Sequence, residues 1–142
     1  MNAQKFTQKS LEAIQEAQSL ALEHNNMQIE EEHLLDALLR QENGLIPQLL
    51  KRMGADAAAL QRGLEEQIAR MPGVTGPGRE AGKIYVSGDV DRVLSDAEKT
   101  ADRMKDEYVS VEHVFLALLD HANPRLRELF AACGVDKDKF LA

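Results

Sequence analysis

Residues 32–39 read EHLLDALL and residues 112–119 read EHVFLALL, so one pattern occurs twice at a spacing of 80 residues. The match extends outward without a gap, and between residues 10 and 60 eleven positions are identical to the residue 80 positions later. Unrelated sequences of that length would share about three or four identities. The chain is therefore a duplicated unit, and its two similar hydrophobic surfaces can bury each other.

Each copy predicts the same series of four helices. The first helix begins at a hydroxyl N-cap, Thr7 or Ser87, and the third is stopped by a glycine, Gly54 or Gly134. The second helix, which carries the repeated pattern, is apolar over most of its circumference and should be the most buried. The fourth follows an aspartate cap, and it is about ten residues shorter in the second copy, so we expect the protein to continue past Ala142.

These patterns predict an all-α fold of two tandem, pseudo-symmetric four-helix repeats packed into one globular domain. Repeat one covers residues 6–71 and repeat two covers residues 86–142. The connector between them, residues 72–85, is rich in glycine and proline and is expected to be exposed and mobile.

Composition excludes several classes of function. The net charge is −7 and no cluster of Lys or Arg occurs, which argues against binding to nucleic acid or to an anionic membrane. No apolar run approaches the roughly 18 residues of a membrane span, and no signal peptide is recognisable. The single Cys133 cannot form an internal disulfide. We interpret the chain as a cytoplasmic protein.

No motif for catalysis or cofactor binding is present. The sequence lacks a phosphate-binding GxxxxGK[ST] loop, an HExxH helix and a CxxC pair, so we expect neither a cofactor nor a metal in this domain. His33 and His113 follow a glutamate near the start of a buried helix, where a histidine more often bonds a neighbouring loop than acts as a base. Cys133, aligned with Met53, is interpreted as a core residue.

The duplication instead favours binding. Two similar helical units packed side by side leave a groove along their seam, and grooves bind extended or helical peptides. Apolar side chains there, rimmed by carboxylates, would attract exposed hydrophobic segments of another protein. The same side chains could also be used up entirely in the core, so packing alone leaves this hypothesis open.

Four stretches carry a more specific signal. They are Phe6-Thr7 before a helix containing Ala17-Gln18, the EHLLDALL segment, MPGV at residues 71–74, and KDEYVSVEH at residues 105–113. Together they resemble the amino-terminal domain, or Clp repeat domain, of the ClpB family of bacterial ATP-driven disaggregase chaperones. The resemblance covers essentially the whole chain and implies an all-helical double repeat tethered to two ATPase rings outside this sequence.

The resemblance also implies a function. In that family the domain captures unfolded or aggregated protein and helps pass it to the ring pore, together with the DnaK chaperone system. ATP and Mg²⁺ would belong to the full-length hexamer, whereas the isolated domain is expected to be a monomer.

The resemblance further implies a set of substrate-binding residues. A polar trio linked to substrate handling corresponds to Thr7, Asp106 and Glu112, although a capping or turn role alone would also explain each of them. A hydrophobic surface would map to Leu94 and the surroundings of His113. Some members of the family have an aliphatic residue where this chain has His113.

Two alternatives belong to other classes. The first is an adaptor-docking or modified-substrate domain like that of the related ClpC and ClpA unfoldases. Repeats of the ClpC type usually read GTEH, whereas EEEH and SVEH stand at residues 30–33 and 110–113 here. The second is a free-standing enzyme, which would require exposed histidines beside a pocket.

Overall fold

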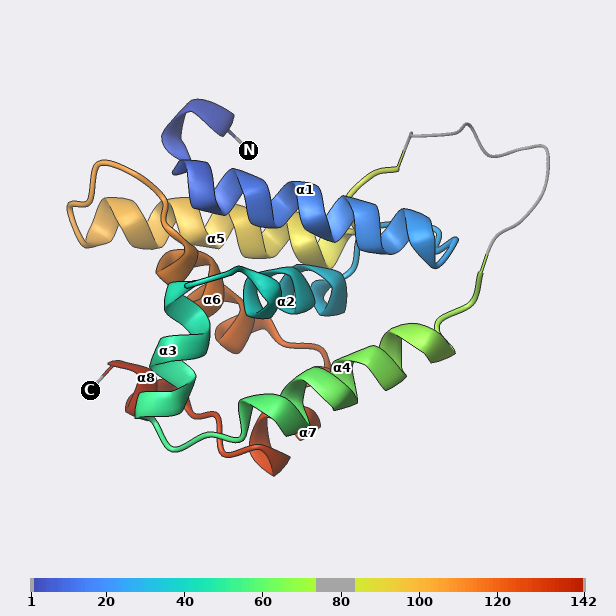
Figure 1. Cartoon of the computed structure of the whole chain (residues 1–142). Helices are drawn as coiled ribbons and strands as arrows, with labels where there is room; N and C mark the ends of the chain where they lie inside the picture. The colour runs from blue at the N-terminus through green and yellow to red at the C-terminus, as the bar shows by residue number, and fades with distance from the viewer. Residues whose placement is uncertain (1, 74–83, 142) are drawn as a thin grey trace.

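The computed structural model describes residues 2–73 and 84–141, and the 80-residue period is preserved in its helices (Figure 1). Repeat one contains α1 (Gln8–Glu23), α2 (Glu31–Arg40), α3 (Leu45–Arg52) and α4 (Ala57–Arg70). Repeat two contains α5 (Gly88–Arg103), α6 (Val111–His121), α7 (Pro124–Ala132) and α8 (Lys137–Leu141). A short 3₁₀ turn, Ala3–Lys5, precedes α1. The predicted all-α double repeat is confirmed.

The helices begin and end where the sequence places their caps. The Thr7 hydroxyl accepts the backbone N–H of Ser10, and the Ser87 hydroxyl accepts that of Val90. Gly54 and Gly134 both end a helix at a φ of +76°, a left-handed conformation that glycine adopts without a steric penalty. Equivalent residues therefore set equivalent boundaries in the two copies.

Helices α2 and α6 form the centre of the molecule. Helix α1 packs on α2 and α5 packs on α6, while α3, α4, α7 and α8 lie on the opposite side (Figure 1). Leu34, Leu35 and Leu38 of α2 are at most 1% exposed, and Phe115 and Leu118 of α6 are completely buried. The prediction that the repeated pattern forms the most buried helix of each unit is confirmed.

Two short backbone pairings tie the repeats together. Phe6 forms a parallel bridge with Val109, and Ile29 forms one with Val86. The hydrogen bonds correspond, since Thr7 N–H donates to the Val109 carbonyl at 3.0 Å and Ser87 N–H donates to the Ile29 carbonyl at 2.9 Å. In both cases the segment before the first helix of one repeat joins the segment before the central helix of the other. The two copies are thus reciprocally interlocked.

The connector falls largely outside the described residues. Residues 74–83 make up most of it, so the prediction that it is exposed and mobile concerns residues that the structure does not describe. Among the described helices, none is both long and apolar enough to cross a membrane.

Candidate functional site

The seam between the repeats contains a hollow of about 320 Å³ with a largely apolar lining. Its walls come from the start of α1, the loop between α2 and α3 with the start of α3, and the start of α6. Leu45 on α3 is 38% exposed there, and Val111 of α6 contributes to the opposite wall. The lining residues are Thr7, Lys9, Gln41, Asn43, Gly44, Leu45, Ser110, Val111 and Glu112.

Thr7 lies in this hollow but is also built into the fold. Its Oγ1 is 2.8 Å from the Ser10 hydroxyl, which in turn donates to the Val109 carbonyl at 3.0 Å. Because the Ser10 proton is used in that second bond, the Thr7 hydroxyl is the donor to Ser10. A ligand in the hollow could therefore only donate a hydrogen bond to Thr7, which already caps α1.

Glu112 reaches the same hollow from the first turn of α6. It is half-buried, and within the described residues its carboxylate makes no hydrogen bond or ion pair. The positive end of the α6 dipole favours a carboxylate at this position. Glu112 is thus the acidic group of the hollow that can meet a donor from another molecule.

Asp106 is connected to the hollow through His113. The Asp106 Oδ2 lies 2.8 Å from His113 Nε2, while His113 Nδ1 accepts the Ser110 backbone N–H at 2.9 Å. Since Nδ1 accepts, Nε2 carries the proton and donates to Asp106. The Asp106 carboxylate remains half exposed. The structure therefore places Thr7 and Glu112 in one hollow, whereas Asp106 does not line it and is linked to the lining residue Ser110 through His113.

The first repeat has the same arrangement with a neutral partner. His33 Nδ1 accepts the Glu30 N–H at 2.8 Å, and its Nε2 lies 2.7 Å from Asn26 Oδ1. Burial lowers the pKa of His33 to about 4, so the ring is neutral at pH 7. Each histidine links a helix start to the preceding loop, as predicted.

The expected hydrophobic surface does not include the two side chains named for it. Leu94 is 3% exposed and belongs to the core, and His113 is 5% exposed beneath Asp106. Leu94 lies on the face of α5 that packs on α6, because apolar residues at helical spacing turn inward together. The exposed apolar groups near Asp106 are Met104 and Tyr108, at 49% and 50% exposure, which the sequence analysis did not select.

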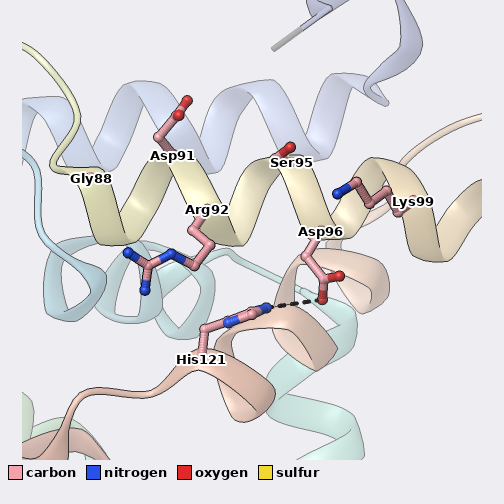
Figure 2. Close-up of a pocket in the computed structure, with 7 residues that line it drawn as sticks. All are labelled: Gly88, Asp91, Arg92, Ser95, Asp96, Lys99 and His121. Atoms are coloured by element: carbon pink, nitrogen blue, oxygen red, sulfur yellow. Dashed lines mark ion pairs between the residues drawn. The ribbon is translucent and has the colours of Figure 1, made fainter.

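A second hollow, of about 350 Å³, lies between α5 and the end of α6 (Figure 2). Its charged side chains have both signs, with Asp91 and Asp96 beside Arg92 and Lys99. Figure 2 shows the His121 ring reaching across to Asp96, with Nε2 3.3 Å from Oδ2. Because acidic and basic side chains are mixed in it, this hollow presents no single chemistry to a ligand.

Sequence reasoning missed two buried carboxylates, Glu31 and Glu32, which are each 1% exposed. Burial raises the pKa of Glu31 to about 7 against the lowering effect of its Asn123 hydrogen bond, and the nearby Asp89 carboxylate adds to the rise. Burial also raises the pKa of Glu32. One signal could have revealed Glu31, because it aligns with the apolar Val111 of the other repeat.

No metal or nucleophile chemistry is assembled in the part of the chain that the structure describes. There, no three residues of the His, Cys, Asp and Glu types lie close enough to hold a metal ion. Cys133 is 6% exposed, and burial raises the pKa of its thiol, which makes it unreactive. Its predicted role as a core residue is confirmed.

Comparison with known proteins gives consistent results. The sequence profile described as "Clp repeat (R) N-terminal domain" matches residues 5–133. The chaperone protein ClpB of Nitratidesulfovibrio vulgaris is 47% identical over 120 residues, which cover 84% of this chain but 14% of that protein's length. This chain therefore spans about one seventh of that relative.

Solved structures are also similar. The Hsp104 N-terminal domain from Candida albicans superposes with a TM-score of 0.81 at 25% identity, over 96% of this chain and 86% of that one. A complex of a ClpV N-domain with a VipB peptide superposes with a TM-score of 0.71 at 22% identity, over 94% of this chain and 81% of that one. The ClpV likeness concerns the fold.

Proposed function

Because the chain belongs to the Clp repeat N-terminal domain family, we propose that it is the client-binding amino-terminal domain of a ClpB-type protein disaggregase. In this role it captures unfolded or aggregated polypeptide and helps deliver it to an ATPase ring. The domain itself binds and releases, and the chemistry of ATP hydrolysis with Mg²⁺ belongs to the ring of the full-length hexamer. The same proposal makes the protein cytoplasmic and a partner of the DnaK chaperone system.

The observation that carries this proposal is the seam hollow with its mixed lining. Leu45, 38% exposed, offers apolar surface to hydrophobic side chains of an unfolded client, which a folded protein would keep buried, and the nearly buried Val111 also lines the hollow. Glu112 adds a carboxylate, without a partner among residues 2–73 and 84–141, that can accept hydrogen bonds from the client backbone or attract a basic side chain. Few groups contribute, so binding should be weak and reversible, as delivery to a ring requires.

The chain's overall charge fits this role. A net charge of −7 disfavours nucleic acid and anionic membranes but not polypeptides with basic flanks.

Substituting Glu112→Ala tests the proposal. We expect binding of an unfolded protein such as casein to weaken by about two- to fivefold, the range of one partly exposed charge contact. The measurement is a titration of labelled domain with casein, followed by the backbone amide shifts of residues around Thr7, Leu45 and Glu112. The free energy of unfolding, measured by thermal denaturation, should change by less than about 1 kcal/mol, because only a helix-dipole interaction is lost.

Glu107→Ala is the matched control, since it removes an exposed carboxylate from the loop before α6. It should leave casein binding unchanged. Shifts confined to the face opposite the hollow, or equal weakening by both variants, would contradict the proposed site. A loss of binding that only parallels a loss of folding would reduce Glu112 to a capping residue.

A further inference from the structure

Because the chain is duplicated, residues equivalent to the lining of the hollow occur a second time, and their contacts differ from those at the hollow. The 80-residue offset aligns three lining residues of the hollow with three residues of the other seam. Val111, Glu112 and Asn43 correspond to Glu31, Glu32 and Asn123. Both sets lie between the start of a central helix of one repeat and the loop before the third helix of the other. The pseudo-symmetry therefore predicts two equivalent hollows, and the contacts at the second seam need an explanation.

At the second seam, α2 is hydrogen-bonded directly to the opposing loop. The Asn123 backbone N–H donates to Glu31 Oε1 at 3.0 Å, and its side-chain Nδ2 donates to Glu32 Oε1 at 3.2 Å. Both glutamates are 1% exposed, so these bonds are shielded from water. At the first seam Val111 has no acceptor to offer, and the Glu112 carboxylate bonds nothing within the described residues.

The opposing loops differ in length and in conformation, since residues 41–44 join α2 to α3 and residues 122–123 join α6 to α7. Asn43 has a φ of +52°, and Gly44 follows it without a side-chain cap for α3. Asn123 has a φ of −66°, accepts the Leu126 N–H at 2.9 Å and is followed by Pro124, which disfavours a left-handed residue before it. The loop of repeat two thus lies against α2, whereas the loop of repeat one stands beside the hollow.

We propose that Glu31 and Glu32 act as a latch that holds Asn123 and closes the second seam, so that the domain offers one client hollow instead of two. This inference rests on the proposed function only for the identity of the ligand. The closure itself is a property of the domain alone. Glu31 and Glu32 are positioning residues that set the number of binding sites, and Pro124 helps by fixing the loop backbone.

The latch is tested first without any client. Glu31→Val places at the second seam the residue that lines the first and removes the acceptor of the Asn123 N–H. We expect the Asn123 amide to exchange its hydrogen about tenfold faster in this variant, as loss of one shielded hydrogen bond to a carboxylate predicts. Glu31→Gln, the matched control, keeps an acceptor oxygen and should preserve slow exchange.

The number of sites is then tested with casein as the probe. In the wild type, amide shifts should occur around Leu45 and Val111 alone. In Glu31→Val, new amide shifts should occur around Arg125 and Glu32, and each domain should bind two casein segments instead of one. Both effects should be stronger when Glu31→Val is combined with Pro124→Gly. The combined variant has valine and glycine at the positions that correspond to Val111 and Gly44 of the first seam. Its helical content, measured by circular dichroism, shows whether it folds.

The outcomes are distinguishable. If the Asn123 amide of Glu31→Val exchanges its hydrogen as slowly as in the wild type, the latch is wrong, irrespective of the result of the casein titration. Faster exchange without new shifts around Arg125, or wild-type shifts at both seams, would overturn the single-site claim. Absence of shifts at the first hollow in the wild type would contradict the proposed function, while the exchange measurement would still decide the latch.

Discussion

At the scale of single residues, the two copies differ most where one side chain carries charge and its counterpart does not. Glu31 replaces Val111, and Asn26 beside His33 replaces Asp106 beside His113. By local sequence Glu31 is an ordinary first-turn acid, because helix starts favour carboxylates. Its burial depends on the loop of the other repeat, which local sequence does not reveal.

The buried Glu31 should make folding stability depend on pH. Its pKa is about 7 in the folded protein against an ordinary 4.5, so the folded state holds a proton that the unfolded chain releases. Stability should therefore fall as the pH rises from about 4.5 to 7. Glu31→Gln should flatten this slope and stabilise the domain at pH 8 by on the order of 1 to 2 kcal/mol.

Urea unfolding at pH 5 and pH 8 measures this difference. Some pH dependence of stability should remain in Glu31→Gln, because burial also raises the pKa of Glu32. The Asp89 carboxylate of α5 is the charged group that faces Glu31 from that helix. A Glu31→Gln variant that is as pH-dependent as the wild type would show that Glu31 titrates normally.

The site residues were predictable only in part. Thr7 and Glu112 share a hollow that Asp106 does not line, and the three residues were selected by family resemblance and not by periodicity. Leu94 was misplaced because an apolar residue on a helix facing the core cannot also form a surface. Leu45, Met104 and Tyr108 were missed because exposure of single apolar residues leaves no pattern in a sequence.

At the scale of helices, boundaries were predictable because their signals are local. Caps such as Thr7, Ser87, Asp56 and Asn123, and stops such as Gly54, act within one turn of their own position. The crossing of α4 and α7 is different, since it depends on the absence of a side chain. A Cβ on Gly63 of α4 would overlap with the Leu129 side chain of α7.

Gly63→Val should therefore destabilise the domain by about 1 to 3 kcal/mol, the usual cost of overpacking. Gly63→Ala should cost less, because alanine favours the helix by about 1 kcal/mol and the end of the Leu129 side chain can turn away. Thermal unfolding of Gly63→Val, Leu129→Ala and the double variant measures the coupling. Fully additive effects would mean that the two helices do not meet at this point.

At the scale of the whole molecule, the duplication predicted the all-α double repeat, but not how the copies hold each other. The reciprocal bridges pair segments that are far apart in the sequence. Phe6 and Val109 are 103 residues apart, and Ile29 and Val86 are 57 residues apart. Such short extended segments carry no periodicity of their own. Their pairing follows from the packing of α2 and α6 at the centre.

This interlocking predicts that neither repeat folds alone. Residues 1–73 would expose Phe6 and Ile29, which are each 4% exposed in the complete domain. Far-UV circular dichroism of residues 1–73, residues 84–142 and their equimolar mixture should give a cooperative melt only for the mixture. A cooperative melt of residues 1–73 alone would show that the bridges are dispensable.

The most direct test of the account uses the pseudo-symmetry as its own control. A photoreactive p-benzoylphenylalanine is placed either at Leu45, inside the hollow, or at Arg125, its counterpart at the second seam. Both variants are irradiated with casein, and the adducts are quantified by gel and mass spectrometry. The account predicts adducts from position 45 and few or none from position 125. Equal crosslinking at both positions, or none at position 45, would contradict it.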